Sequence, residues 1–136
     1  MIARDPRSLA GARVAVLQPL LPHYRVPVFD LLARTTGIEL TVLCDMHPKG
    51  SLKSVPPTDA FRCEHSDYRP LGPVFSQPAM LSVATGRRFD AAVFHWSTRD
   101  LELLPSLLAC RATRKGSVLW GHGYSKQDSP TRRALR

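Results

Sequence analysis

Five short apolar runs alternate with amphipathic stretches along the chain, and this alternation predicts the fold. The runs occupy residues 13–17, 38–44, 61–65, 89–95 and 117–120. The first contains four consecutive apolar residues, as expected of a strand buried on both faces of a sheet, and the second is rich in strand-forming residues. The third run alternates with polar residues and gives a weaker strand signal.

The first predicted helix follows the first run and ends at Gly37. Pro27 suits its first turn, and the apolar spacing of i, i+3, i+4 and i+7 predicts one buried side. That buried side is predicted to consist of Val28, Leu31, Leu32 and Thr35.

Two further helices are predicted before the last run. A short one covers residues 79–85 and follows an irregular stretch, 69–78, that is rich in proline and glycine. A longer one is predicted to follow a turn from Ser97 to Asp100 that resembles a capping box. Pro105 should kink this helix or shift its start. Its buried side is predicted to contain Leu101, Leu104, Leu108 and Ala112.

Strands that alternate with helices predict an α/β fold, a Rossmann-like doubly wound parallel sheet of about five strands in the order 3-2-1-4-5. Residues 1–12 have no periodicity and are expected to form a loosely ordered leader ahead of a domain covering 13–136. Ser129 and Pro130 look like the start of a helix that runs off the end of the sequence. We therefore expect the chain to be the N-terminal part of a longer protein.

Composition is typical of one globular domain, with 136 residues, 43% apolar and 22% charged. No apolar run approaches the length of a membrane span and no signal peptide is recognisable, so a cytoplasmic location is expected. The three cysteines are scattered without a CxxC pair, which argues against a disulfide framework or a zinc site. We expect them to be reduced, with Cys44 and Cys110 facing the core.

Positive charge is concentrated near the C-terminus. The net charge is +8, and residues 101–136 carry seven basic but only two acidic side chains. Such a region can contact anionic lipid, a diphosphate or nucleic acid, or it can be a solvated surface with no specific partner.

Familiar nucleotide-binding and hydrolase motifs are absent. The first predicted strand is followed by Gln18 and Pro19 instead of a glycine-rich turn, which argues against a dinucleotide enzyme. The sequence also lacks a GxxxxGK[ST] phosphate loop and a GxSxG nucleophile motif.

Polar residues instead follow three predicted strands, where ligands bind in open parallel sheets. They are Gln18, His23, Tyr24 and Arg25 after the first, His95 and Trp96 after the fourth, and His122 between Gly121 and Gly123 after the fifth. No metal is expected, because the histidines lack ligand spacing and no carboxylate accompanies them.

Each candidate also has a structural interpretation. His122 can bind a ligand beside two small glycines or simply hydrogen-bond the backbone in a tight turn. His95 and Trp96 can contact a ligand or pack at the edge of the core. Tyr24 and Arg25 can do no more than fix the start of the first helix.

Three segments resemble the N-terminal domain of GT-B glycosyltransferases, particularly the glycosyltransferase 4-like group. They cover residues 13–34, 89–96 and 118–125, and the most specific parts are Pro-His-Tyr-Arg-Val-Pro at 22–27 and Trp-Gly-His-Gly-Tyr at 120–124. The resemblance extends from about Arg13 to the end of the chain.

The resemblance implies an acceptor-binding half of a hexosyl-type transferase, inactive alone, whose nucleotide-sugar donor binds a second domain. It implies no cofactor and no essential metal. His122 would be catalytic, Gly121 and Gly123 would face the donor phosphates, and the acceptor would contact Gln18, His23, Tyr24, Arg25, His95 and Trp96. The chain departs from the family at Leu20-Leu21-Pro22, where many members carry a glycine pair, and it lacks the donor domain with its paired glutamates.

The expected partners are therefore a nucleotide sugar and an acceptor that can be lipid-linked, with no nucleic acid. The basic C-terminal part suggests a peripheral contact with anionic lipid at the inner membrane surface. An interpretation from another class is a stand-alone α/β module that binds a ligand or a protein and catalyses nothing.

Overall fold

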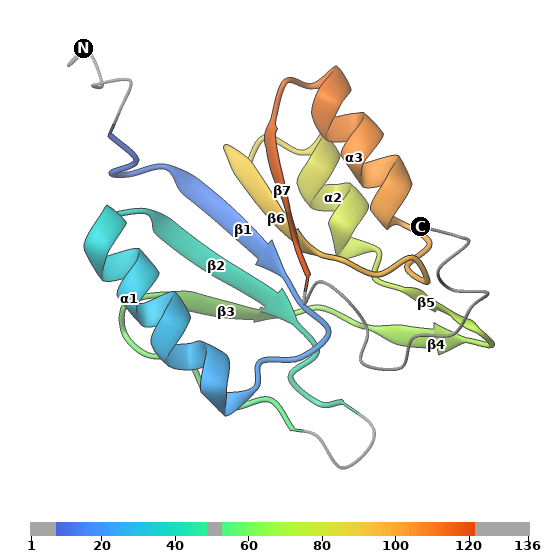
Figure 1. Cartoon of the computed structure of the whole chain (residues 1–136), viewed down its shortest axis with the longest axis horizontal. Coiled ribbons are helices and arrows are strands. Elements are labelled where there is room, and N and C mark those ends of the chain that lie inside the picture. Colours follow the sequence, from blue (N-terminus) through green and yellow to red (C-terminus); the bar gives the residue numbers. More distant parts are fainter. Residues whose placement is uncertain (1–7, 49–52, 122–136) are drawn as a thin grey trace, which may run out of the picture.

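A five-stranded parallel sheet forms the centre of the described part of the chain, in a computed structural model that describes residues 8–48 and 53–121 (Figure 1). The strand order is β3-β2-β1-β6-β7. The predicted order 3-2-1-4-5 and the Rossmann-like α/β fold are confirmed. The strands are β1 (Arg13–Leu17), β2 (Glu39–Cys44), β3 (Arg62–His65), β6 (Ala91–His95) and β7 (Gly116–Trp120).

Helices cover both faces of this sheet. Helix α1 (Val26–Thr36) lies on one face, whereas α2 (Ala79–Thr85) and α3 (Leu103–Ala112) lie together on the other (Figure 1). A short 3-10 turn, η1 (His23–Arg25), leads directly into α1. The core is therefore two layers of side chains, one on each side of the sheet.

Strand β1 feeds both layers because successive side chains point to opposite faces. Ala15 and Leu17 pack in the layer under α2 and α3, and Val16 packs in the layer under α1. Burial on both faces explains why this strand is an uninterrupted apolar run in the sequence.

The predicted buried side of α1 is wrong. Val28, Leu31 and Leu32 are exposed, as is Thr35, and the helix buries Phe29 and Ala33 instead. The helix carries apolar residues on more than one side, and the side with the large aromatic ring packs against the sheet. The predicted end is confirmed, because Gly37 caps the helix in the left-handed region with φ of 68°.

The predicted buried side of α3 is wrong for a related reason. Its start is shifted to Leu103, which places Pro105 in the first turn, where proline is tolerated. Leu101 then precedes the helix. The exposed positions are Leu101, Leu104, Leu108 and Ala112, and the buried ones are Leu103, Ser106 and Cys110.

Residues 69–78, predicted to be irregular, contain a hairpin. Strands β4 (Arg69–Leu71) and β5 (Val74–Ser76) pair antiparallel. Gly72 adopts a φ of 64° in the two-residue turn, a conformation that glycine permits readily. The hairpin also meets the loop after β6, since the amide of Phe75 donates to Arg99 O at 2.9 Å and that of Leu101 to Phe75 O at 3.0 Å.

The cysteine predictions are confirmed where burial tests them. Cys44 and Cys110 are fully buried, Cys63 is half-buried, and all three are free thiols. Of the predicted leader, residues 8–12 lie within the described part, and Gly11 N–H donates to Gly37 O at 2.8 Å.

Candidate functional site

The ends of β1 and β6 bring Gln18 and His95 to the same edge of the sheet. Leu17 pairs with Phe94 in the parallel register, so the next residues, Gln18 and His95, are neighbours. This is the switch point where the chain order reverses, the usual ligand position in an open α/β sheet.

Gln18 is fully buried, yet within residues 8–48 and 53–121 its side chain has no hydrogen-bond partner. Its backbone N–H donates to Leu43 O at 3.0 Å. Neither Nε2 nor Oε1 of its amide has a partner among the described residues. An unsatisfied buried amide costs about 1–3 kcal/mol, so such a group is usually retained for a reason other than stability.

His95 faces a buried carboxylate. Its Nε2 lies 2.7 Å from Oδ2 of Asp100, whose side chain is fully buried. The two atoms are close enough for an ion pair when the imidazole is protonated, but their approach is not aligned as a hydrogen bond. Asp100, predicted to cap a helix, instead points into the molecule.

Tyr68 completes this arrangement from the chain segment before the hairpin. Its hydroxyl donates to Asp100 Oδ1 at 2.8 Å, and its ring stacks on Phe75 with centroids 4.9 Å apart. The same ring meets His95 edge-on at 5.7 Å. Burial, followed by the Asp100 carboxylate, raises the pKa of Tyr68 well above its ordinary value, so the neutral phenol is favoured.

Gln77 joins the loops that enclose these groups. Its Nε2 donates to Gln18 O at 3.1 Å, to Leu43 O at 3.4 Å and to Ser66 Oγ at 3.2 Å. Its Oε1 is buried without a partner among the described residues. We call Gln18, Gln77, His95, Asp100 and Tyr68 the carboxyl-edge cluster.

Two tryptophans lie at the ends of the neighbouring strands: Trp96 follows β6, and Trp120 ends β7. Trp96 is about half exposed, and its amide donates to Trp120 O at 2.8 Å. A Cβ on Gly121 would lie 3.0 Å from Cβ of Trp96, so the indole packs directly on the Gly121 backbone. The guanidinium of Arg25 lies over the Trp120 ring, 5.1 Å from its centroid.

The remaining sequence candidates have different positions. His23 and Tyr24 lie in η1, exposed and in edge-on contact with each other at 5.7 Å. Among the described residues they form no contact with Gln18 or His95 that would place them in the cluster. His122 and Gly123 lie outside the described residues.

Sequence reasoning missed Tyr68, Gln77 and Asp100. The signal that points to them is topological. The chain must cross from β3 to β6 over the switch point, so residues 66–79 necessarily pass the ends of β1 and β2.

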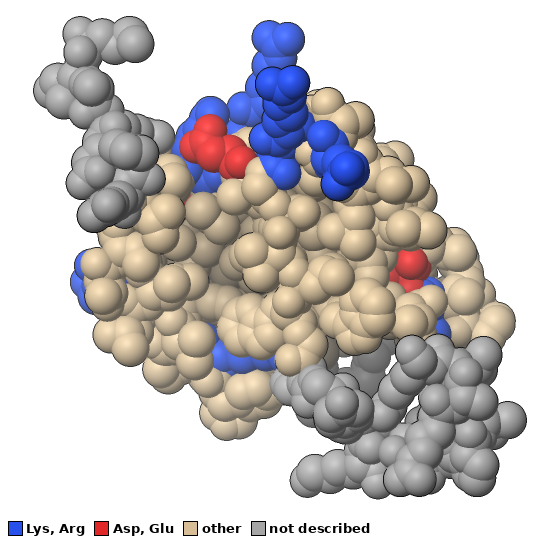
Figure 2. Space-filling view, turned by 45° about the horizontal axis from the view of Figure 1, so that its top comes forward, with Lys and Arg blue, Asp and Glu red and all other residues tan. Residues whose placement is uncertain are grey.

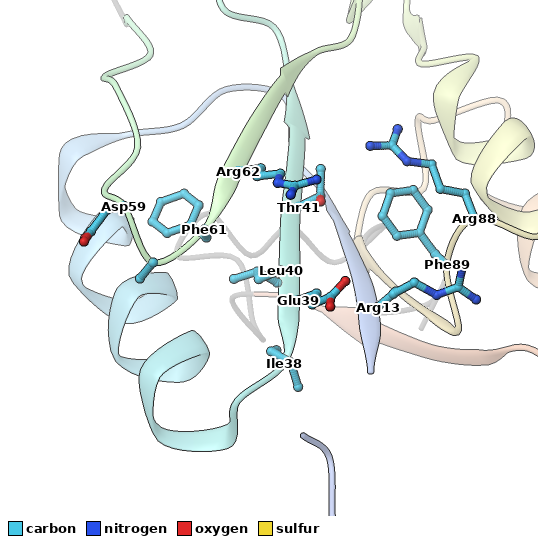
Figure 3. A pocket seen from close by; sticks show the side chains of 11 residues that line it. Arg13, Ile38, Glu39, Leu40, Thr41, Asp59, Phe61, Arg62, Arg88 and Phe89 are labelled. Atoms are coloured by element: carbon cyan, nitrogen blue, oxygen red, sulfur yellow. The ribbon is translucent and has the colours of Figure 1, made fainter. Parts of the chain in front are cut away.

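A hollow of about 330 Å³ lies at the other end of the sheet, where Arg13, Glu39 and Arg62 surround the start of β2 (Figure 3). Two of the arginines that line it pair with carboxylates outside its lining. Arg13 bonds Asp90 at 2.9 Å, and Arg88 bonds Glu64 and lowers the pKa of that carboxyl. Within the described chain, no residue lining the hollow has a buried polar side-chain atom without a partner. The carboxyl-edge cluster is therefore the stronger candidate site.

Comparisons with protein-family models, with curated proteins and with solved structures gave no match. Across residues 8–48 and 53–121, no helix is long and apolar enough to cross a membrane. The same residues contain no group of three or more His, Cys, Asp or Glu side chains that could hold a metal ion.

Proposed function

We propose that the chain is the acceptor-binding half of a glycosyltransferase, and that the carboxyl-edge cluster holds the acceptor. The observation that supports this most is the buried, unpartnered amide of Gln18 beside the His95 and Asp100 pair. An amide, an imidazole and a carboxylate can together donate to and accept from the hydroxyl groups of a sugar. Among the described residues, six buried side-chain atoms of this cluster lack an aligned hydrogen-bond partner, which favours a polar ligand over a structural role.

Trp96 adds a second feature that suits a carbohydrate. Its half-exposed indole belongs to the residue that follows His95 and offers a flat apolar face. A sugar ring has an apolar face of carbon-bound hydrogens and a rim of hydroxyls, so it matches an aromatic wall beside a polar cluster. In this proposal Trp96 packs on the ring, and Gln18 and His95 bind its hydroxyls.

The donor side of the proposal rests on the resemblance of the sequence to GT-B enzymes. A second domain would bind the nucleotide sugar, with Gly121 and Gly123 facing its phosphates. His122 would donate a hydrogen bond toward the leaving diphosphate, which favours the transition state because negative charge develops there. No metal or other cofactor is part of this proposal.

Turnover by the full-length protein tests this proposal. His122→Ala should lower kcat at least ~10²-fold, as removal of a single preorganised donor does. The 136-residue chain alone should not transfer sugar from a nucleotide donor. Normal turnover by that chain, or by the His122→Ala protein, contradicts the assignment.

Binding by the chain itself is a separate test. A panel of methyl glycosides, followed by two-dimensional NMR of ¹⁵N-labelled chain, should shift the indole N–H of Trp96 and the side-chain amide of Gln18. The control variant is Leu104→Ala, because Leu104 lies on the exposed side of α3. Gln77→Leu is unsuitable as a control, because Gln77 holds the loops together by hydrogen bonds. Equal responses from Gln18→Leu and unchanged chain exclude Gln18 as a ligand-binding residue.

A lipid-linked acceptor at the inner membrane surface remains part of the proposal. Within the described residues, Arg111 lies in the last turn of α3, and Arg114 and Lys115 lie between α3 and β7, at the amino edge of the sheet. Figure 2 shows basic side chains gathered at one end of the visible surface, with acidic groups beside them. The carboxyl-edge cluster lies at the opposite ends of the strands, so these three residues do not adjoin it.

Lipid contact is tested by sedimentation with phosphatidylglycerol and phosphatidylcholine vesicles at low and high salt. Binding to the anionic vesicles that salt weakens supports the contact. Absence of binding at low salt excludes it.

The alternative function is a stand-alone α/β module that binds a ligand or protein without catalysis. Leu104 and Leu108 are exposed one turn apart on α3, and they are the apolar surface that a protein partner would cover. The coding sequence beyond Arg136 distinguishes the two functions. A second α/β domain with paired glutamates supports the transferase, and a stop codon supports the module.

A further inference from the structure

Three sulfur atoms meet at the side of the sheet covered by α1. Cys44 Sγ lies 3.4 Å from Cys63 Sγ and 3.5 Å from Met46 Sδ, and Cys63 Sγ lies 3.2 Å from Met46 Sδ. The three atoms therefore form a nearly equilateral triangle. We call Cys44, Met46 and Cys63 the sulfur triad.

The sheet and one loop hold the triad in place. Cys44 ends β2, and Cys63 lies on the adjacent strand β3, opposite Val42. Met46 follows β2 after one residue, and its N–H donates to His65 Nδ1 at 3.1 Å. None of the three side chains depends on a long flexible loop for its position.

Burial leaves the triad in an apolar setting that solvent can still reach. Cys44 is fully buried, whereas Met46 and Cys63 are half-buried against the same apolar layer. An ion could reach the triad from the side of Met46 and Cys63.

The triad cannot satisfy all its contacts by hydrogen bonding. Each thiol has one proton to donate, and the thioether of Met46 has none. Two protons are therefore available for three sulfur–sulfur contacts. In one of these contacts, lone pairs always face each other with no proton between them. A cation in the centre would meet lone pairs from all three atoms.

Distances favour a cation over a covalent bond between the cysteines. Three sulfurs around an ion at about 2.3 Å, the usual length of a metal–sulfur bond, lie about 4.0 Å apart. The triad at 3.2–3.5 Å needs to widen by roughly half an ångström to reach that spacing. A disulfide of about 2.05 Å requires the two Sγ atoms, now 3.4 Å apart, to move more than twice as far.

We propose that Cys44, Met46 and Cys63 form a binding site for a soft monovalent metal ion, Cu(I). Thiolate and thioether sulfurs select Cu(I) because soft ligands bind soft ions. Zinc in structural sites instead takes four ligands from cysteine, histidine and carboxylate side chains, a set that does not include thioethers. Each thiol that becomes a ligand forms a sulfur–copper bond and releases its proton to solvent, with no change in oxidation state.

This site is independent of the proposed transferase activity. The triad packs in the layer under α1 with Val42 and Phe29, whereas the acceptor proposal rests on Gln18, His95 and Asp100. Either proposal can fail without affecting the other.

The test is anaerobic titration of the reduced full chain with Cu(I), with bicinchoninate as the competing chromophore. We expect one Cu(I) per chain. Loss of an outer hydrogen-bond partner of a metal ligand already costs about 10–100-fold in affinity, so removal of a ligand should cost at least as much. Cys63→Ser and Met46→Leu should therefore weaken binding by roughly tenfold or more.

Two variants keep the test interpretable. Met46→Leu conserves volume and should fold, and circular dichroism checks this before titration. Cys110→Ala removes a buried thiol from the opposite layer, so it should leave Cu(I) affinity unchanged. X-ray absorption at the copper edge should find sulfur neighbours only.

Three outcomes overturn the proposal. One is unchanged Cu(I) affinity in folded Cys63→Ser. Another is unchanged affinity in folded Met46→Leu, which would remove the thioether from the site. The last is failure of the reduced chain to retain Cu(I) against bicinchoninate. A disulfide between Cys44 and Cys63 would then be the alternative, and mild peroxide treatment would lower the mass of the chain by two hydrogens and protect both cysteines from alkylation.

Discussion

His95 Nε2 lies 2.7 Å from Oδ2 of Asp100, and Asp100 is held on its other side by the hydroxyl of Tyr68, 2.8 Å from Oδ1. The carboxylate therefore serves two ring side chains that come from distant parts of the sequence. Because Asp100 is buried, the interaction operates with little solvent screening.

A double-mutant cycle between His95→Gln and Asp100→Asn should measure this interaction. We expect a coupling free energy of about 1–3 kcal/mol in urea unfolding, as found for residues in one buried network. The control cycle pairs Asp100→Asn with Thr85→Ala at the exposed end of α2, which should be additive. Additivity within about 0.5 kcal/mol between His95 and Asp100 would show that their proximity carries no energy.

Tyr68 should lose its proton only at an unusually high pH. Its pKa is raised because burial and Asp100 disfavour the tyrosinate. The folded chain then holds this proton more tightly than the unfolded chain, so the free energy of unfolding should fall as pH rises above about 10, the ordinary tyrosine value.

Tyrosinate absorbance and alkaline unfolding test this expectation together. Tyr68→Phe should remove the absorbance step at unusually high pH and flatten the loss of stability above pH ~10. Tyr24→Phe, which removes an exposed hydroxyl, is the matched control and should leave both features. A Tyr68→Phe chain with an unchanged titration curve would contradict the assignment.

Gln18 and Gln77 should respond in opposite directions to the same substitution. Gln18→Leu removes an unpartnered buried amide, so stability should be unchanged or higher by up to about 1 kcal/mol. Gln77→Leu removes a donor from three acceptors and should cost about 1–3 kcal/mol. Chemical denaturation of both variants decides, and an equal loss in both would mean that Gln18 is a structural residue.

Gly121 should tolerate no side chain while Trp96 keeps its position. An alanine Cβ would lie 3.0 Å from Trp96 Cβ, so Gly121→Ala should displace the indole and cost about 1–3 kcal/mol, as overpacking does. The chain has two tryptophans. In a Trp120→Phe background, a change in fluorescence maximum therefore reports on Trp96.

Ser117→Ala, at an exposed position of β7, the strand that Gly121 follows, is the matched substitution for Gly121→Ala. It should leave fluorescence unchanged and stability within about 0.5 kcal/mol. If Gly121→Ala behaves in the same way, the close packing of Trp96 on the Gly121 backbone has no energetic importance.

The sequence predicted the sheet well because its strands carry their own signal. A strand buried on both faces carries a nearly continuous apolar run, and residues 14–17 of β1, 42–44 of β2 and 91–94 of β6 are such runs. The strand order then follows from general rules of α/β topology, and it brings the ends of β1 and β6, and with them Gln18 and His95, together.

Predictions from local sequence patterns were wrong where the same pattern suits two different structures. Residues 97–100 match the pattern of a helix cap, but Asp100 turns inward because its neighbours pair with Phe75 of the hairpin. The helices α1 and α3 carry apolar residues on more than one side, and only packing against the sheet selects Phe29 and Cys110. Tyr68 and Gln77 have no local signal, since their roles arise from long-range contacts.

The pairing of Phe75 with the loop after β6 has a consequence for motion. Its two hydrogen bonds, to Arg99 O and from Leu101 N–H, join the hairpin to the segment that carries Asp100. Because both hydrogen bonds join the same two segments, separation of the hairpin from the loop breaks both at once. The amide hydrogens of Phe75 and Leu101 should therefore exchange with similar protection. A ligand that binds Asp100 or Tyr68 would then slow amide hydrogen exchange throughout the hairpin, although the turn of the hairpin would not contact that ligand.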